Sequence, residues 1–167
     1  MKPEQALFQV LNATGLTLSL AESCTGGLVS ARLVSIPGIS SFFLGGVVSY
    51  TNSVKKTLLS VREESLVRYT AVSEPVAREM ADGVRLSTGS DIGVSVTGLA
   101  GPGGGTAEIP VGRVFIGVST ASGCRAFRFL FRGGRERIRR SAAVAALKLA
   151  REAACQFAVT RKDEKIQ

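Results

Sequence analysis

The segment LTLSLAESCTGGLVSARLV, residues 16–34, decides the fold of this chain. Residues 16–20 are mostly apolar and predict a buried strand, whereas the apolar spacing of residues 28–34 favours a helix. Between them lie two hydroxyls, a thiol and two glycines, in the order Ser23, Cys24, Thr25, Gly26 and Gly27. Backbone N–H groups at the start of a helix are unpaired and carry partial positive charge, so a nucleophile at this junction would have oxyanion donors beside it. The alternative is an ordinary helix cap formed by Ser23 or Thr25.

The rest of the chain continues this alternation of strand and helix patterns. We expect further helices at residues 3–13, 52–59, 73–86 and 134–159, with the helix of the first segment covering 25–34. Further strands are expected at 42–50, 92–97, 111–120 and 125–131, the last two joined as a hairpin near Ser122 and Gly123. Alternation predicts an α/β layered domain, and the hairpin makes its sheet mixed. Ligands of such sheets bind at the carboxyl ends of strands, so segments 23–27, 50–55 and 97–106 are expected to converge on one crevice.

Size and composition indicate one globular domain. The chain has 167 residues, of which 45% are hydrophobic, with no repeat or interdomain linker. We assign residues 1–160 to a single domain and 161–167 to a charged C-terminal tail. The apolar runs are too short for a membrane span, and the first residues lack the pattern of a signal peptide. We therefore expect a cytoplasmic location and no membrane partner. The sequence leaves open whether the chain forms a homo-oligomer.

The absence of histidine restricts the chemistry. Three widely spaced cysteines, Cys24, Cys124 and Cys155, give no disulfide framework and no cluster typical of a zinc site. A Ser-His-Asp triad is excluded within one chain. We expect no metal site and no cofactor, and proton transfer near neutral pH falls to Lys, Tyr, Asp, Glu or Cys.

Positive charge is concentrated in the last quarter of the chain. Residues 1–124 hold nine basic and nine acidic side chains, whereas residues 125–167 hold twelve basic and four acidic ones. Five arginines fall within residues 132–140, a cluster that suits phosphate or, alternatively, a solvated helix face. No aromatic residue lies between Arg132 and Arg151, so stacking on single-stranded nucleic acid has no support and we do not expect a nucleic-acid partner.

Two further segments carry candidate site residues. If Asn52 caps the helix at 52–59, Lys55 falls in its first turn, where the helix dipole and partial burial both lower a lysine pKa. Such a lysine can act as the general base for a serine, although an exposed lysine beside Lys56 is the simpler alternative. The loop Gly98 to Pro110 is rich in glycine but lacks the ending of a P-loop. Its amides can bind an anion, or the loop is merely flexible.

Four motifs in register make the chain resemble a known family. They are Ala-Glu-Ser-Cys-Thr-Gly-Gly at 21–27, Phe-x-Gly-Gly-Val-Val-x-Tyr-x-Asn-x-x-Lys at 43–55, Ala-Val-Ser-Glu-Pro-Val-Ala at 71–77, and Thr-Gly-x-Ala-Gly-Pro-Gly-Gly-Gly-Thr at 97–106. This combination resembles the CinA C-terminal domain family, which includes the PncC-type nicotinamide mononucleotide deamidases. The resemblance implies a three-layer α/β/α sandwich with a mixed, mainly parallel central sheet. It also implies hydrolysis of nicotinamide mononucleotide to nicotinate mononucleotide and ammonia.

The same resemblance assigns roles to individual residues. It implies Ser23 as the nucleophile, with Lys55 and Tyr50 in proton transfer, and amides at the start of the following helix as oxyanion donors. The substrate-binding candidates are Thr25, Gly26, Gly27, Asn52, Thr97, Gly98, Ala100, Gly101, Arg135 and Arg139. Of these, Arg135 and Arg139 are expected to hold the substrate phosphate. Two alternatives stay open: Cys24 as the nucleophile, and a non-catalytic nucleotide-binding module of a competence or DNA-damage-response protein.

Overall fold

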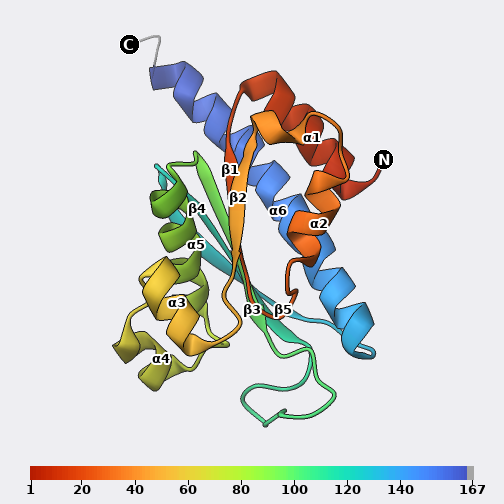
Figure 1. The fold of residues 1–167 in the computed structure, drawn as a ribbon, viewed down its shortest axis with the longest axis vertical. Coiled ribbons are helices and arrows are strands. Elements are labelled where there is room, and N and C mark those ends of the chain that lie inside the picture. The colour runs from red at the N-terminus through yellow and green to blue at the C-terminus, as the bar shows by residue number, and fades with distance from the viewer. Residues whose placement is uncertain (165–167) are drawn as a thin grey trace.

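The computed structural model describes residues 1–164 and shows one mixed five-stranded sheet between two layers of helices (Figure 1). The strands are β1 (Leu18–Glu22), β2 (Phe43–Val48), β3 (Ile92–Gly98), β4 (Arg113–Thr120) and β5 (Gly123–Leu130). The helices are α1 (Pro3–Thr14), α2 (Leu28–Val34), α3 (Asn52–Leu59), α4 (Glu63–Tyr69), α5 (Glu74–Thr88) and α6 (Arg135–Glu164), with a short 3-10 turn at Ile39–Ser41. The predicted α/β/α sandwich is confirmed.

The sheet has the order β2-β1-β3-β4-β5. Both neighbours of β1 run parallel to it, whereas β4 is antiparallel to β3 and to β5. Four strands therefore point the same way and β4 alone is reversed, which agrees with the predicted hairpin. The three consecutive parallel strands β2, β1 and β3 end at the same edge of the sheet, and this edge carries the candidate site.

A separate hydrophobic core lies on each face of the sheet. On one face α1, α2 and α6 cover side chains such as Leu18, Leu20 and Ile116. On the other face α3, α4 and α5 cover a smaller group that includes Ala21, Met80 and Val84. Because both faces are covered, every residue of β1 is buried. Within the described residues 1–164, no helix has both the length and the apolar character needed to cross a membrane.

Several boundaries differ from the predicted ones. Strand β1 is shifted by two residues and continues through Glu22. Helix α2 begins at Leu28, not at residue 25, because Gly26 and Gly27 have φ angles of 58° and 91°, which no helix accommodates. Helix α3 is capped by Thr51, whose hydroxyl accepts from the Val54 N–H, and the expected cap Asn52 is instead the first helical residue.

Helix α6 is longer than predicted. It runs without interruption from Arg135 to Glu164, past the expected end near residue 159 and into the segment 161–167 that we expected to be a tail. Residues 165–167 of that segment lie outside the described part of the chain. At its first turns, α6 reaches the edge of the sheet where the three parallel strands end (Figure 1).

Candidate active site

Three polar segments meet where the parallel strands end. Ser23 directly follows β1, and Ser49 directly follows β2, while Thr97 and Gly98 close β3. The strand register aligns Glu22 with Val48 on one side and with Val96 on the other. The three segments that were predicted to converge, 23–27, 50–55 and 97–106, thus all follow the carboxyl ends of the parallel strands.

A buried lysine lies against the candidate nucleophile. The Lys55 Nζ donates to the Ser23 Oγ at 3.0 Å and to the Ser49 backbone carbonyl at 2.6 Å. Lys55 is 1% exposed and Ser23 is 8% exposed. Helix α3 provides this placement, since Thr51 caps it and Lys55 points back to the sheet while its neighbour Lys56 pairs with Glu63 outside. The pairing of Ser23 with Lys55 has the geometry of a nucleophile and its base.

Burial lowers the pKa of Lys55 from 10.5 to about 8, a change that the thiol of Cys24 only partly opposes. Among the described residues, no carboxylate pairs with the Lys55 amine, which otherwise would restore its charge. An amine with this pKa is neutral in a useful fraction of molecules near neutral pH. It can therefore take a proton from a hydroxyl.

The adjacent cysteine is a poor rival nucleophile. Burial raises the pKa of the Cys24 thiol from 9.0 to about 11. The attacking species of a cysteine is the thiolate, which at this pKa is scarce near neutral pH. The environment of the site therefore favours Ser23 over Cys24.

The turn that carries Ser23, residues 23–27 and hereafter the nucleophile turn, is held by a carboxylate that sequence reasoning missed. Glu22 is buried and accepts from the N–H groups of Gly27, Val29 and Ser30 and from the Ser30 hydroxyl, at 2.7–3.1 Å. These amides lie at the N-terminal end of α2 and have no carbonyl partner within the helix. Because Glu22 already bonds to them, these three amides are not available to hold an oxyanion. An acidic residue just before a helix was the available signal.

Tyr50 and Asn52 lie at the exposed surface of the candidate site. Tyr50 is 57% exposed, and its hydroxyl accepts from the Arg135 Nη2 at 3.1 Å. In the described part of the chain its hydroxyl bonds to neither Ser23 nor Lys55. Asn52 is exposed at the start of α3. In the described structure, no hydrogen bond therefore joins either residue to Ser23 or Lys55.

The glycine-rich loop is buried only at its start. The Thr97 hydroxyl donates to the Ala71 carbonyl at 2.7 Å, so it supports the loop from beneath. Ala100 and Gly101 are buried, whereas residues 102–108 are exposed. Gly101 has a φ of 74°, and its carbonyl accepts from the Arg135 Nη1 at 2.7 Å. Arg135 thus bonds to both this loop and Tyr50.

Arg139 lies against the nucleophile turn itself. Its Nε donates to the Cys24 carbonyl at 3.2 Å and its Nη2 to the Thr25 carbonyl at 2.8 Å, while Glu136 pairs with its Nη1. All three guanidinium nitrogens are therefore in contact with protein acceptors. The structure thus brings both arginines to the candidate site, Arg135 against Tyr50 and the glycine-rich loop and Arg139 against the nucleophile turn.

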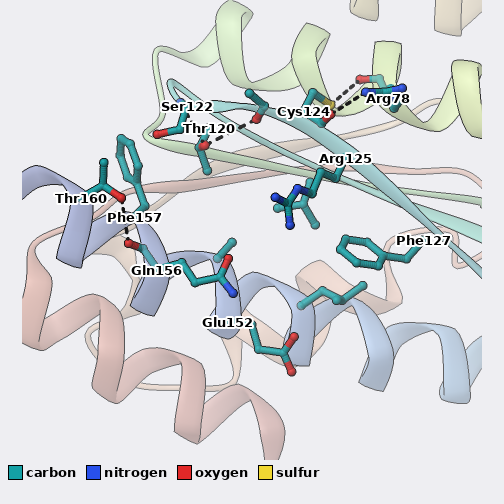
Figure 2. Close-up of a pocket in the computed structure, with 14 residues that line it drawn as sticks. Arg78, Thr120, Ser122, Cys124, Arg125, Phe127, Glu152, Gln156, Phe157 and Thr160 are labelled. Carbon is teal, nitrogen blue, oxygen red and sulfur yellow. Dashed lines mark hydrogen bonds between the residues drawn. The ribbon is translucent and has the colours of Figure 1, made fainter.

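A hollow of 510 Å³ lies at the other end of the sheet, between β5 and α6 (Figure 2). Arg125 and Phe127 reach into it from β5, and Glu152, Gln156 and Phe157 line it from α6. Ser23 and Lys55 are not among its lining residues. The hollow is therefore separate from the candidate active site.

Comparison with known proteins assigns the family. The family model described as CinA C-terminal domain matches residues 1–154. The chain belongs to the CinA C-terminal domain family. This CinA domain is 55% identical over 126 residues to a "CinA-like protein" of Geotalea uraniireducens, a match that covers 75% of the chain and 30% of the relative. A "CinA-like protein" of Kosmotoga olearia is 45% identical over 150 residues, which cover 90% of the chain and 36% of the relative.

Solved structures share the fold. A "Competence-Damaged Protein (CinA) Superfamily Protein" of Klebsiella pneumoniae has a TM-score of 0.88 at 32% identity, covering 92% of this CinA domain and 96% of that chain. A superfamily protein of Escherichia coli has a TM-score of 0.85 at 36% identity, covering 89% and 87%. The chain spans about a third of the length of the curated relatives it matches and nearly all of these solved structures.

Proposed function

We propose that this CinA domain is a serine amidase that hydrolyses nicotinamide mononucleotide to nicotinate mononucleotide and ammonia. The observation that carries the proposal is the buried Lys55 amine 3.0 Å from the Ser23 hydroxyl. The choice of substrate is supported by the resemblance of four motifs to the deamidases of the family. It agrees with the placement of Arg135 against the glycine-rich loop, since both groups suit a nucleotide phosphate.

The reaction proceeds through an acyl-enzyme. Neutral Lys55 takes the proton of Ser23 as the Ser23 Oγ bonds to the carboxamide carbon, and the carbonyl electron pair moves to its oxygen. When that pair returns, the C–N bond breaks and Lys55 gives its proton to the leaving nitrogen, which departs as ammonia. Water then attacks the ester with Lys55 as base, and Ser23 recovers its proton. Tyr50 and Asn52 are positioned to contact the substrate.

Pure protein and pure substrate test this proposal. We expect ammonia and nicotinate mononucleotide to appear in equal amounts from nicotinamide mononucleotide, and free nicotinamide to be spared. Activity is expected to survive prolonged chelation, since no cluster of three metal-ligating side chains occurs among the described residues. Cleavage of free nicotinamide alone would overturn the nucleotide substrate. Loss of activity on chelation, with recovery on adding a metal ion, would overturn the serine–lysine mechanism.

A second function is suggested by a relative's name. A protein of Desulforudis audaxviator, 47% identical over 136 residues, is called "Putative competence-damage inducible protein". On this view the domain binds a nucleotide without hydrolysing it. Binding of nicotinamide mononucleotide in calorimetry without release of ammonia would favour that function over the amidase.

A further inference from the structure

Two N–H groups of the nucleophile turn have no acceptor in another residue of the described chain. The Ser23 N–H donates to the Val96 carbonyl at 2.9 Å, and the Gly26 N–H donates to the Ser23 carbonyl at 3.0 Å. The Gly27 N–H is taken by Glu22. Within residues 1–164, the N–H groups of Cys24 and Thr25 are then the members of this turn that donate to no backbone carbonyl, and the Cys24 N–H contacts only the thiol of its own residue.

These two groups lie in a buried place. Cys24 is 6% exposed and Thr25 is fully buried. The Thr25 hydroxyl is buried as well, and it has no hydrogen-bond partner in the described part of the chain. Buried N–H groups without a partner are rare in native proteins because each one costs free energy. Because they directly follow Ser23 in the chain, they are placed to donate to an oxygen that is bound during the reaction.

Arg139 and the Gly26 N–H fix the direction in which these groups point. In a trans peptide, the carbonyl and the following N–H lie on opposite sides of the chain. The Ser23 carbonyl is held by Gly26, which sets the Cys24 N–H. The Cys24 carbonyl is held by the Arg139 Nε, which turns the Thr25 N–H away from Arg139. The second bond of Arg139, to the Thr25 carbonyl, prevents rotation of the next peptide.

We propose that the backbone N–H groups of Cys24 and Thr25 are the oxyanion donors and that Arg139 is the positioning residue that orients them. This inference rests on the proposed serine mechanism, but not on the identity of the substrate. It replaces the expectation that Arg139 holds the substrate phosphate. Its guanidinium already bonds to two carbonyls of the turn and to Glu136, so its main effect is on the geometry of the donors.

A small fluorophosphonate tests the proposal independently of the natural substrate. In its reaction the Ser23 Oγ–P bond forms, the P–F bond breaks, fluoride leaves and the serine proton passes to Lys55, while the phosphoryl oxygen accepts from the oxyanion donors. We expect Arg139→Ala to slow this labelling by about 10- to 100-fold, since losing a donor or its alignment costs on the order of 10²-fold. Arg139→Lys keeps a cationic donor for one carbonyl. Its labelling rate should therefore lie between the rates of the wild type and of Arg139→Ala.

Arg140→Ala is the matched control. Arg140 is exposed on the next residue of α6 and pairs only with Glu136 among the described ion pairs, so its removal should leave labelling unchanged. In turnover assays, Arg139→Ala should lower kcat with little change in KM. The factor should be the same for nicotinamide mononucleotide and for nicotinamide riboside, which lacks the phosphate. Melting curves of the folded variants show whether a loss of stability accompanies the loss of rate.

The outcomes separate this inference from the proposed function. Equal labelling of Arg139→Ala and Arg140→Ala overturns the positioning role. A rise in KM limited to the phosphorylated substrate, with labelling unchanged, assigns Arg139 to phosphate binding and also overturns it. If wild-type protein is labelled at Ser23 but does not hydrolyse nicotinamide mononucleotide, only the substrate is wrong, and the labelling rates still decide the role of Arg139. Absence of label on Ser23 overturns both.

Discussion

The nucleophile turn and the glycine-rich loop both lie at the carboxyl ends of the parallel strands, yet they are built in opposite ways. The turn is mostly buried, and Glu22 and Arg139 bond to it from two sides. The loop is held at its base by pairing of Leu99 with Arg113 and Gly112, and its residues 102–108 are exposed.

Under the proposed function, this difference assigns the chemical reaction to the turn and substrate recognition to the loop. Atoms that react must be held within a fraction of an ångström, whereas a loop that closes on a ligand must be free to adjust. Substitutions in the turn should therefore change kcat, and substitutions around the loop should change KM. Four predictions test that division, ordered from the largest effect to the smallest.

Removing the nucleophile should have the largest effect. Ser23→Ala is expected to lower kcat by at least about 10⁴-fold, because among the described residues Ser23 supplies the hydroxyl that bonds to Lys55, and losing a nucleophile removes the covalent path. Ser53→Ala, an exposed serine of α3, is the control and should retain full activity. The measurement is ammonia release at saturating substrate. Turnover by Ser23→Ala, or a substrate-derived adduct on Cys24, would move the nucleophile to the thiol.

Removing the base should come next. Lys55→Met is expected to lower kcat by about 10²- to 10⁴-fold, the usual range for a general base. Lys56→Met should have no effect, since Lys56 faces outward and pairs with Glu63. In the wild type, activity should fall as pH drops below about 8, where the Lys55 amine becomes protonated. A profile that stays flat from pH 9 down to pH 6 would show that Lys55 is not the base.

The same lysine should make stability depend on pH. Burial lowers the pKa of Lys55 to about 8 from 10.5, so between these pH values the unfolded chain binds more protons than the folded one. The free energy of unfolding of the wild type, relative to Lys55→Met, should therefore rise as pH increases from 8 to 10.5 and stay level below 8. The full rise is about 3 kcal/mol, given about 1.4 kcal/mol per pKa unit. Denaturant titrations of both proteins at several pH values measure it, and a pH-independent difference contradicts the lowered pKa.

The smallest effect is expected from replacing Arg135, which bonds to the glycine-rich loop and to Tyr50. Arg135→Ala should raise KM for nicotinamide mononucleotide by about 10- to 100-fold, which corresponds to losing one charged hydrogen bond of about 1.5–3 kcal/mol. The rise should be smaller for nicotinamide riboside, and kcat should change little. Arg137→Ala, an exposed arginine on the same turn, is the control. An equal fall in kcat for both substrates would show that Arg135 acts on the nucleophile turn and not on substrate binding at the glycine-rich loop.

The sequence was sufficient for the order of the strands and of most helices, and for the segments that bring Ser23 and Lys55 together. Apolar runs located β1 and β3, and glycine and proline punctuation located the turns, because these signals are local. The position of Lys55 could be predicted because a helix start is also a local signal, even though the cap is Thr51 and not Asn52. Both Ser23 and Lys55 lie in motifs that the sequence displays directly.

What the sequence did not predict depends on contacts between distant or unremarkable groups. Ser49 acts on Lys55 through its backbone carbonyl, which every residue type possesses. Glu22 looked like an ordinary acid next to the motif until its carboxylate was seen to bond the amides of α2. The charge of Arg139 predicts an anion-binding role, but only its packing against the nucleophile turn shows which groups it bonds to.

The position of Arg139 along the chain has a consequence for when the site forms. Ser23 and Lys55 are 32 residues apart, whereas Arg139 is 114 and 115 residues from the carbonyls it holds. Contacts of such long sequence separation carry the larger loop-closure entropy and are the slower ones to form. A chain made only as far as residue 134 has its serine, its lysine and Glu22, but it lacks the arginine that holds the Cys24 and Thr25 carbonyls. We expect hydrolytic activity to appear only after α6 has been made and has docked, so that shorter chains are inactive.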